Sequence, residues 1–231
     1  DPKKGLVDES NSLILLENSL NSSELKMVIE QKSSNQKFEL KNKTLNIDTM
    51  EMEGVETGIF ESEFSGESTI LNLNELKFND NVNANFTNGV EVKVESFITQ
   101  GKNSKVNIQG ANSKFEIENL TIAKENTSEF KINNGALVKS NLLTIGDEED
   151  STGALSLTGD NSFLEITEQA IIGNSGDANL TITDKSTLKA KDLILSNLNT
   201  SDSTLTLSGN ESVLNATNIV LSKSGEATLM V

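Results

Sequence analysis

Histidine, cysteine and arginine are absent from all 231 positions of this chain, so no imidazole can activate a serine and no thiol is available as a nucleophile. Without histidine, neither a Ser-His-Asp nor a Cys-His arrangement can form, and the commonest metal ligand is missing. The stretch Gly173-Asn174-Ser175-Gly176-Asp177 contains a serine between glycines, but no base that could activate it. We therefore interpret this stretch as a turn.

Carboxylates are the remaining catalytic candidates, and the densest cluster is Asp147-Glu148-Glu149-Asp150. Polysaccharide-cleaving enzymes can work with Asp or Glu alone, and such an enzyme would show a groove lined by carboxylates from neighbouring turns. Four adjacent acids in a loop point in different directions, so we expect these to be solvated, with weak calcium binding as the alternative. The sequence predicts no catalytic, cofactor-binding or metal-binding residue.

Threonine and serine recur at matching places in the second half of the chain and could form a flat ladder of hydroxyl groups. Thr181 and Thr206 are examples, and such a ladder is typical of an ice-binding face. The equivalent positions of other repeats hold Asn107, Lys131 and Ser156, which interrupt the ladder. We therefore do not expect ice binding.

The net charge of the chain argues against two classes of binding partner, nucleic acids and anionic membranes. Thirty-five acidic residues against 19 lysines give a formal charge of −16. Nucleic acid and anionic membrane surfaces both require a basic face, so neither is an expected partner. No run of about 18 apolar residues is present, so we expect no membrane insertion by this segment.

A repeated pair of apolar residues indicates the elements that must position any site. The pairs skip one residue and begin at Val106, Phe130, Leu155, Leu180, Leu205 and Leu229, in steps of 24, 25, 25, 25 and 24. Each unit contains three such pairs, as in Leu205/Leu207, Leu214/Ala216 and Ile219/Leu221. Alternation with a period of two is typical of strands with one buried face, and clusters of Gly, Asn and Ser separate the pairs.

Units of this size cannot bury an apolar face alone and must stack on one another. The sequence therefore predicts an all-β, parallel β-helix (β-solenoid) with about 22–25 residues and three strands per turn. An antiparallel β-solenoid or a β-sandwich would give a similar spacing of strands and is the alternative.

We expect one continuous domain with two parts. Residues 1–80 should form irregular turns, with a loop or an excursion from the stack near 48–68, and residues 81–231 should form regular repeats. The chain begins without Met, and residues 227–231 fall inside the sixth copy of the repeat, which is typical of a piece of a longer, truncated protein.

The segments GALSLTGDNS (153–162) and STLTLSGNES (203–212) resemble passenger repeats of bacterial autotransporters, the proteins of type V secretion. The match extends from about residue 81 onward and is to a style of repeat. The resemblance implies a right-handed β-helical passenger that is exported through the outer membrane and is displayed on, or released from, a bacterial cell.

These observations predict a non-enzymatic adhesin, toxin-like binding protein or stalk, found outside the cell or on its surface. Its partner would be a host-cell or cell-surface receptor or a glycan, bound by one outer face or by loops such as 48–68. A carbohydrate-active β-helix enzyme or phage tail protein is one alternative, and a purely structural solenoid is another.

Overall fold

The computed structural model describes residues 13–34 and 36–231, and these form a single all-β coil without helices. Strands with odd numbers make a 10-stranded sheet and strands with even numbers a 9-stranded sheet. The odd strands are β1 (Leu13–Leu15), β3 (Lys37–Lys41), β5 (Phe60–Ser65), β7 (Val82–Thr87), β9 (Ser104–Gln109), β11 (Thr127–Asn133), β13 (Thr152–Thr158), β15 (Asp177–Ile182), β17 (Asp202–Leu207) and β19 (Glu226–Met230). The even strands, which are longer, are β2 (Leu20–Glu30), β4 (Thr44–Glu53), β6 (Ile70–Phe78), β8 (Glu91–Thr99), β10 (Lys114–Ile122), β12 (Leu137–Ile145), β14 (Phe163–Ile172), β16 (Thr187–Leu195) and β18 (Val213–Leu221).

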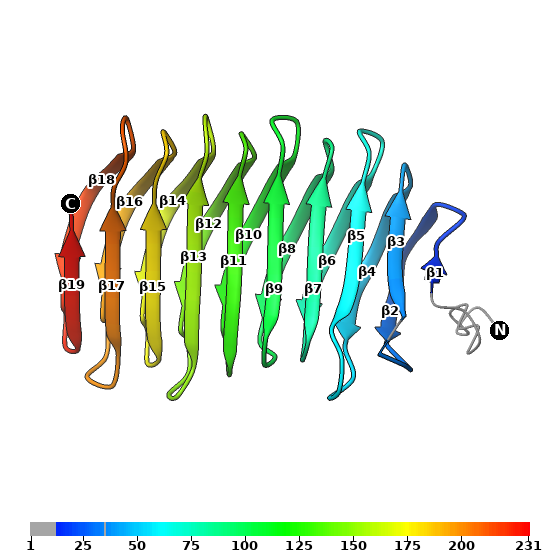
Figure 1. The fold of residues 1–231 in the computed structure, drawn as a ribbon, viewed down its shortest axis with the longest axis horizontal. Helices are drawn as coiled ribbons and strands as arrows, with labels where there is room; N and C mark the ends of the chain where they lie inside the picture. Colours follow the sequence, from blue (N-terminus) through cyan, green and yellow to red (C-terminus); the bar gives the residue numbers. More distant parts are fainter. Residues whose placement is uncertain (1–12, 35) are drawn as a thin grey trace.

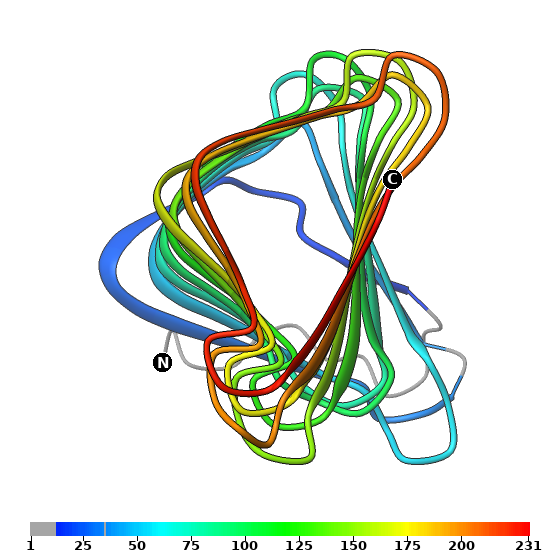
Figure 2. The same ribbon diagram turned by 90° about the vertical axis from the view of Figure 1, so that its left-hand side faces the viewer.

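The coil is right-handed and has about nine turns. In Figure 1 the chain climbs an odd strand at the front, crosses to the back, descends an even strand and moves one place to the left. Neighbouring strands within each sheet are parallel. Figure 2 looks along the coil and shows the turns superposed in a three-sided outline. The predicted parallel β-helix is confirmed.

The stacking register follows the apolar pairs. Phe130 pairs with Leu155, Leu155 with Leu180, and Leu180 with Leu205, so equivalent side chains form one column across four turns. All four side chains are at most 1% exposed. The column places these residues inside the coil, where burial of aliphatic surface stabilises each turn against its neighbours.

Each turn contains two strands, whereas the sequence suggested three. The second and third apolar pairs lie on one continuous long strand that bends between them. In β16, Leu188 and Ala190 point inward and the next inward residues are Leu193 and Leu195, so the alternation shifts by one residue at the bend. Lys191 and Asp192 consequently both point outward, and the bend produces the third corner of the outline.

The segment 48–68 belongs to the coil, where the sequence suggested an irregular loop. It contains the end of β4, a turn at 54–59 and the whole of β5. Met50, Met52, Phe60 and Phe64 are fully buried. Methionine and phenylalanine replace the aliphatic pairs of later turns, which hides the period in the sequence. Residues 1–12 lie outside the described part of the chain.

Tight corners connect each short strand to the long strand that follows it. Asn134 (φ 53) and Gly135 (φ 84) both have left-handed backbone conformations at the corner after β11. The equivalent Gly159 (φ 86) lies so close to this corner that an added Cβ would be 3.0 Å from the Asn134 amide nitrogen. Asparagine and glycine tolerate positive φ, which explains their recurrence at these places.

Aromatic side chains fill the interior of the first half of the coil. Phe86 stacks on Phe64 with 4.4 Å between ring centroids and contacts the edge of Phe115 at 5.1 Å. Phe97 continues the cluster to Phe130, with centroids 5.5 Å apart. The later turns use Leu and Ile in the same columns, so the core changes composition while the register is kept.

Candidate functional site

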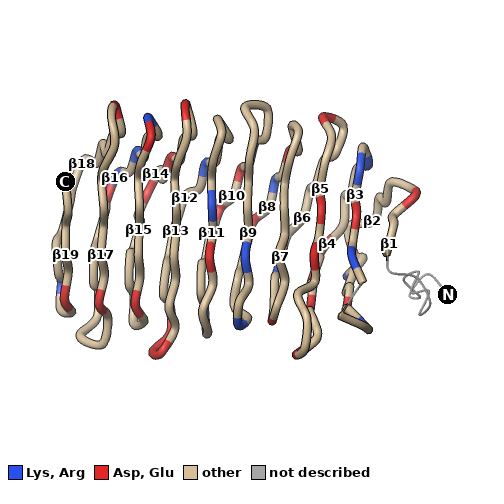
Figure 3. The backbone as a smooth tube through the Cα atoms, in the orientation of Figure 1, with Lys and Arg blue, Asp and Glu red and all other residues tan. Residues whose placement is uncertain are grey.

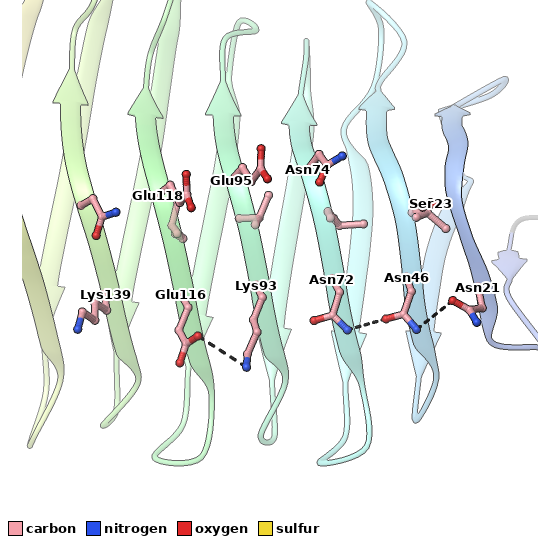
Figure 4. A pocket seen from close by; sticks show the side chains of 15 residues that line it. Asn21, Ser23, Asn46, Asn72, Asn74, Lys93, Glu95, Glu116, Glu118 and Lys139 are labelled. Carbon is pink, nitrogen blue, oxygen red and sulfur yellow. Dashed lines mark hydrogen bonds and ion pairs between the residues drawn. The ribbon is translucent and has the colours of Figure 1, made fainter.

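A groove of about 640 Å³ runs along the outer face of the 9-stranded sheet, across β2, β4, β6, β8, β10 and β12. It is perpendicular to the strands and therefore parallel to the axis of the coil (Figure 4). Two rows of outward side chains border it. We name them the first row, on the part of each long strand before the bend, and the bend row, at the bend itself.

The first row is produced by the parallel register. Outward residues at one level of successive even strands pair in order along the sheet. They are Asn21, Asn46, Asn72, Lys93, Glu116, Lys139, Glu165, Lys189 and Asn215. The row is therefore uncharged at its N-terminal end and alternates in sign from β8 to β16.

Asparagine amides form a hydrogen-bonded ladder at the uncharged end. Asn72 Nδ2 donates to Asn46 Oδ1 at 2.5 Å, and Asn46 Nδ2 donates to Asn21 Oδ1 at 3.4 Å. An amide has two N–H donors and one oxygen with two lone pairs, so each bond to a neighbour leaves further capacity for a ligand. The ladder fixes the orientation of the amides at the edge of the groove.

Ion pairs hold the charged end of the first row. Lys93 Nζ lies 3.7 Å from Glu116 Oε2, and Glu165 accepts from Lys189 Nζ at 2.8 Å with Lys139 Nζ at 3.8 Å on its other side. The hydrogen bond from Lys189 is the main reason that the pKa of Glu165 is lowered. These pairs are at the surface, where water screens them, so they order the row more than they stabilise the fold.

The bend row consists of Ser23, Asn74, Glu95, Glu118 and Asn141. Asn74 Nδ2 donates to Asp48 Oδ1 at 2.7 Å, whereas Asn141 Oδ1 accepts from Thr167 Oγ1 at 2.9 Å. The carboxylates of Glu95 and Glu118 are exposed and come from adjacent turns. Figure 4 shows both above the first row, on the opposite side of the groove from Lys93 and Glu116.

The floor of the groove is a narrow aliphatic strip between these rows. Ile47, Leu73, Val94 and Ile117 point into the core and are only 3–5% exposed. They border the groove through the small part of their surface that is exposed. The site thus combines a thin apolar floor with two polar walls.

The acidic cluster lies in a corner loop between β12 and β13, away from the groove. Asp147 Oδ1 accepts from Asn174 Nδ2 at 2.8 Å, and Glu148, Glu149 and Asp150 are exposed. Within residues 13–34 and 36–231, no three acidic side chains are grouped so that they could hold a metal ion. Ser175 lies at the next corner of the same stack, in the turn between β14 and β15.

The Thr and Ser positions that the sequence suggested as a hydroxyl ladder form one column on the outer face of the 10-stranded sheet, and Asn and Lys interrupt it. Asn107, Lys131, Ser156, Thr181 and Thr206 pair in order along this column. Lysines and carboxylates both occur along the length of the coil in the view of Figure 3. This side is flat and mixed in chemistry, so the groove is the better candidate for a binding site.

We predict that the free energy of unfolding depends on pH because of Glu63, a carboxylate of β5 on this outer face. Burial is the main reason that the pKa of Glu63 is raised, the charge of Glu39 adds to it, and the hydrogen bond donated by Thr87 Oγ1 at 2.6 Å opposes it. A raised pKa means that ionisation costs stability as pH rises from the ordinary value of 4.5 through the folded-state value. We expect Glu63→Gln to be more stable than the wild type at neutral pH and to lose this advantage in acid.

Urea unfolding over a range of pH measures this difference. Glu149→Gln, an exposed corner carboxylate, controls for the removal of one negative charge. An advantage of Glu63→Gln that stays constant from neutral to acid pH would contradict the assignment.

The groove residues were not identified from the sequence, which pointed to one outer face without naming its residues, or to loops such as 48–68. The signal that could have identified them is the spacing of Lys93, Glu116, Lys139, Glu165 and Lys189, which recur at the period of the repeat and alternate in sign. Outward positions were compared only for the column that contains Thr181 and Thr206, so the charged column of the long strands was missed.

Among the described residues there is no helix long and apolar enough to cross a membrane. Comparison of the chain with protein-family models, with curated proteins and with solved structures gives no match in any of the three.

Proposed function

We propose that this chain is a non-enzymatic segment of an exported solenoid that acts outside the cell or on its surface, as a binding protein on a stiff stalk. Its partner is a receptor or a glycan of a host or bacterial cell surface. The proposal includes the finer assignment to an autotransporter-like passenger, which rests on the resemblance of segments 153–162 and 203–212 to passenger repeats.

The observation that carries the proposal is the groove. It crosses six successive strands and is bordered by ordered polar rows, so it offers an extended surface to a ligand. Neighbouring turns are connected along both sheets by parallel pairing, which supports a role as a stiff stalk. A long ligand could therefore bind to several turns at once without rearrangement of the chain.

A carbohydrate-active enzyme is the second candidate, because the groove contains Glu95, Glu116 and Glu118 from two neighbouring turns. This is the arrangement that we expected of an enzyme and not of an adhesin. We favour binding because all three carboxylates are exposed and Glu116 is paired with Lys93. A general acid that works near neutral pH is normally kept protonated by an apolar pocket.

Two measurements on the same protein preparation distinguish ligand binding from enzymatic cleavage of polysaccharide. Labelled protein is titrated onto epithelial and bacterial cells, and unlabelled protein is incubated with soluble polysaccharides while reducing ends are counted. We expect saturable binding to one cell type and no release of reducing ends. The double variant Glu95→Gln/Glu118→Gln controls for chemistry by the groove carboxylates.

Release of reducing ends that the double variant abolishes would establish the enzyme and overturn the proposal. Absence of saturable binding to any cell surface would also overturn it, in favour of a purely structural segment.

A further inference from the structure

The groove repeats itself along its length, and this property limits the ligands that fit it. Successive strands are about 4.8 Å apart, so the six strands extend over about 24 Å. Each of the six strands contributes one residue to the first row at the same register level, and five of them contribute one residue to the bend row. A ligand that satisfies all of these positions must be long, straight and periodic, with a repeat close to the spacing of strands.

A linear polysaccharide has these properties, because one extended pyranose residue is about as long as one strand spacing. Its faces are also suited to the site. A sugar ring can lie over the narrow strip between the rows, where Leu73, Val94 and Ile117 are only 4–5% exposed, while ring hydroxyls point sideways to the two polar rows. Hydroxyl groups both donate and accept, as the free positions of the asparagine amides do.

The charges of the groove exclude an acidic polymer. Its lining includes two lysines, Lys93 and Lys139, and three glutamates, Glu95, Glu116 and Glu118. Lys93 is already paired with Glu116. The local balance is therefore slightly negative in a chain whose total formal charge is −16, and a uronic acid polymer would be repelled.

We infer that the groove binds an uncharged linear polysaccharide, of hexose or N-acetylhexosamine units, which lies parallel to the coil axis with about one sugar residue per turn. This inference rests on the proposed function, in which the groove is the ligand-binding surface. None of the described residues that line the groove is aromatic, so affinity comes from many weak hydrogen bonds and grows with the length of the sugar chain.

Calorimetric titration with neutral oligosaccharides of increasing length tests the inference. The probes are cello- and chito-oligosaccharides, with polygalacturonate as the acidic comparison. We expect affinity to rise with each added sugar up to about six residues, one for each strand of the groove, and then to level off. Polygalacturonate should not bind.

Asn72→Leu is the decisive variant, because Asn72 ends the uncharged ladder beside Lys93 and lies on the third of the six strands that the groove crosses. We expect it to weaken binding of the longest oligosaccharide at least about tenfold. Asn107→Leu is the matched control, since Asn107 is also an outward asparagine bonded to another asparagine, on the other sheet. It should bind like the wild type. If Asn72→Leu fails to fold, Asn74→Leu on the bend row replaces it.

Affinity that does not depend on chain length, binding of polygalacturonate, or equal affinities of Asn72→Leu and wild type would each overturn the inference. Binding of Asn72→Leu to cells at wild-type strength would overturn it too, while the proposed function would stand. Oligosaccharide binding without any cell binding would leave the groove assignment intact and refute the proposed function.

Discussion

Phe86→Ala is expected to lower the free energy of unfolding by about 3–5 kcal/mol, because it removes the centre of the aromatic cluster and leaves a cavity. Phe86 is fully buried, and its ring lies 4.4 Å from Phe64 and 5.1 Å from Phe115 between centroids. Rings of Phe78 and Phe97 are at 6.4 and 6.5 Å. Truncation therefore removes contacts with turns on both sides.

Urea unfolding followed by far-ultraviolet circular dichroism measures this loss, since the chain has no tryptophan. Asn85→Ala is the matched control, because Asn85 is the preceding residue of β7 and points outward. It should cost less than about 1 kcal/mol. Equal effects of the two substitutions would mean that Phe86 does not support the core.

Leu180→Asp is expected to cost about 3–5 kcal/mol at neutral pH, because it places an unpaired carboxylate in an apolar column. Leu180 is 1% exposed and lies between Leu155 and Leu205. Burial should raise the pKa of the introduced carboxyl above its ordinary value. The part of the cost that is due to charge is therefore largest above the raised pKa and should disappear as pH falls below about 3.9, where the unfolded chain is protonated as well, whereas the loss of leucine packing remains at every pH.

Leu180→Asn isolates the contribution of charge, because it has nearly the same shape and cannot ionise. We expect the Asp variant to be the less stable of the two near pH 7 and the two to become similar in acid. Thr181→Asp, on the outer side of the same strand, should change stability little at any pH. If Leu180→Asp and Leu180→Asn unfolded together over the whole pH range, the side chain would not be in the interior.

The register of the coil could be predicted because it depends on inward residues, and these obey a simple rule. Leu155, Leu180 and Leu205 recur at intervals of one turn and must share an environment if units of one kind stack. The positions of corners such as 159–162 could be predicted for a related reason, since a positive φ favours glycine and asparagine.

The number of strands per turn could not be predicted in the same way. Burial shifts by one residue at Lys191 and Asp192, and an apolar pattern does not distinguish a bend within one strand from a break between two. Hydrogen bonding continues on both sides of the bend, as the pairing of β16 with β18 shows. That continuity is a property of the backbone and leaves no mark on side-chain type.

The early turns were hidden for another reason. Their length varies, since the paired residues Asn46 and Asn72 are 26 residues apart and the paired residues Asn85 and Asn107 are 22 apart, and large flexible side chains such as Met50 replace Leu. The groove could not be predicted because outward residues contact each other and a ligand. Their residue types therefore show no hydrophobic periodicity.

Equivalent residues pair from one turn of the coil to the next, so duplication of a whole repeat unit can lengthen the coil. A copied unit of about 25 residues would insert one more layer, and Leu155 and Leu180 would each still meet an equivalent partner. The same event would add one member to the first row and one to the bend row. Descendants of such a gene could therefore acquire longer or shorter grooves by simple copying errors, with the rest of the molecule unchanged.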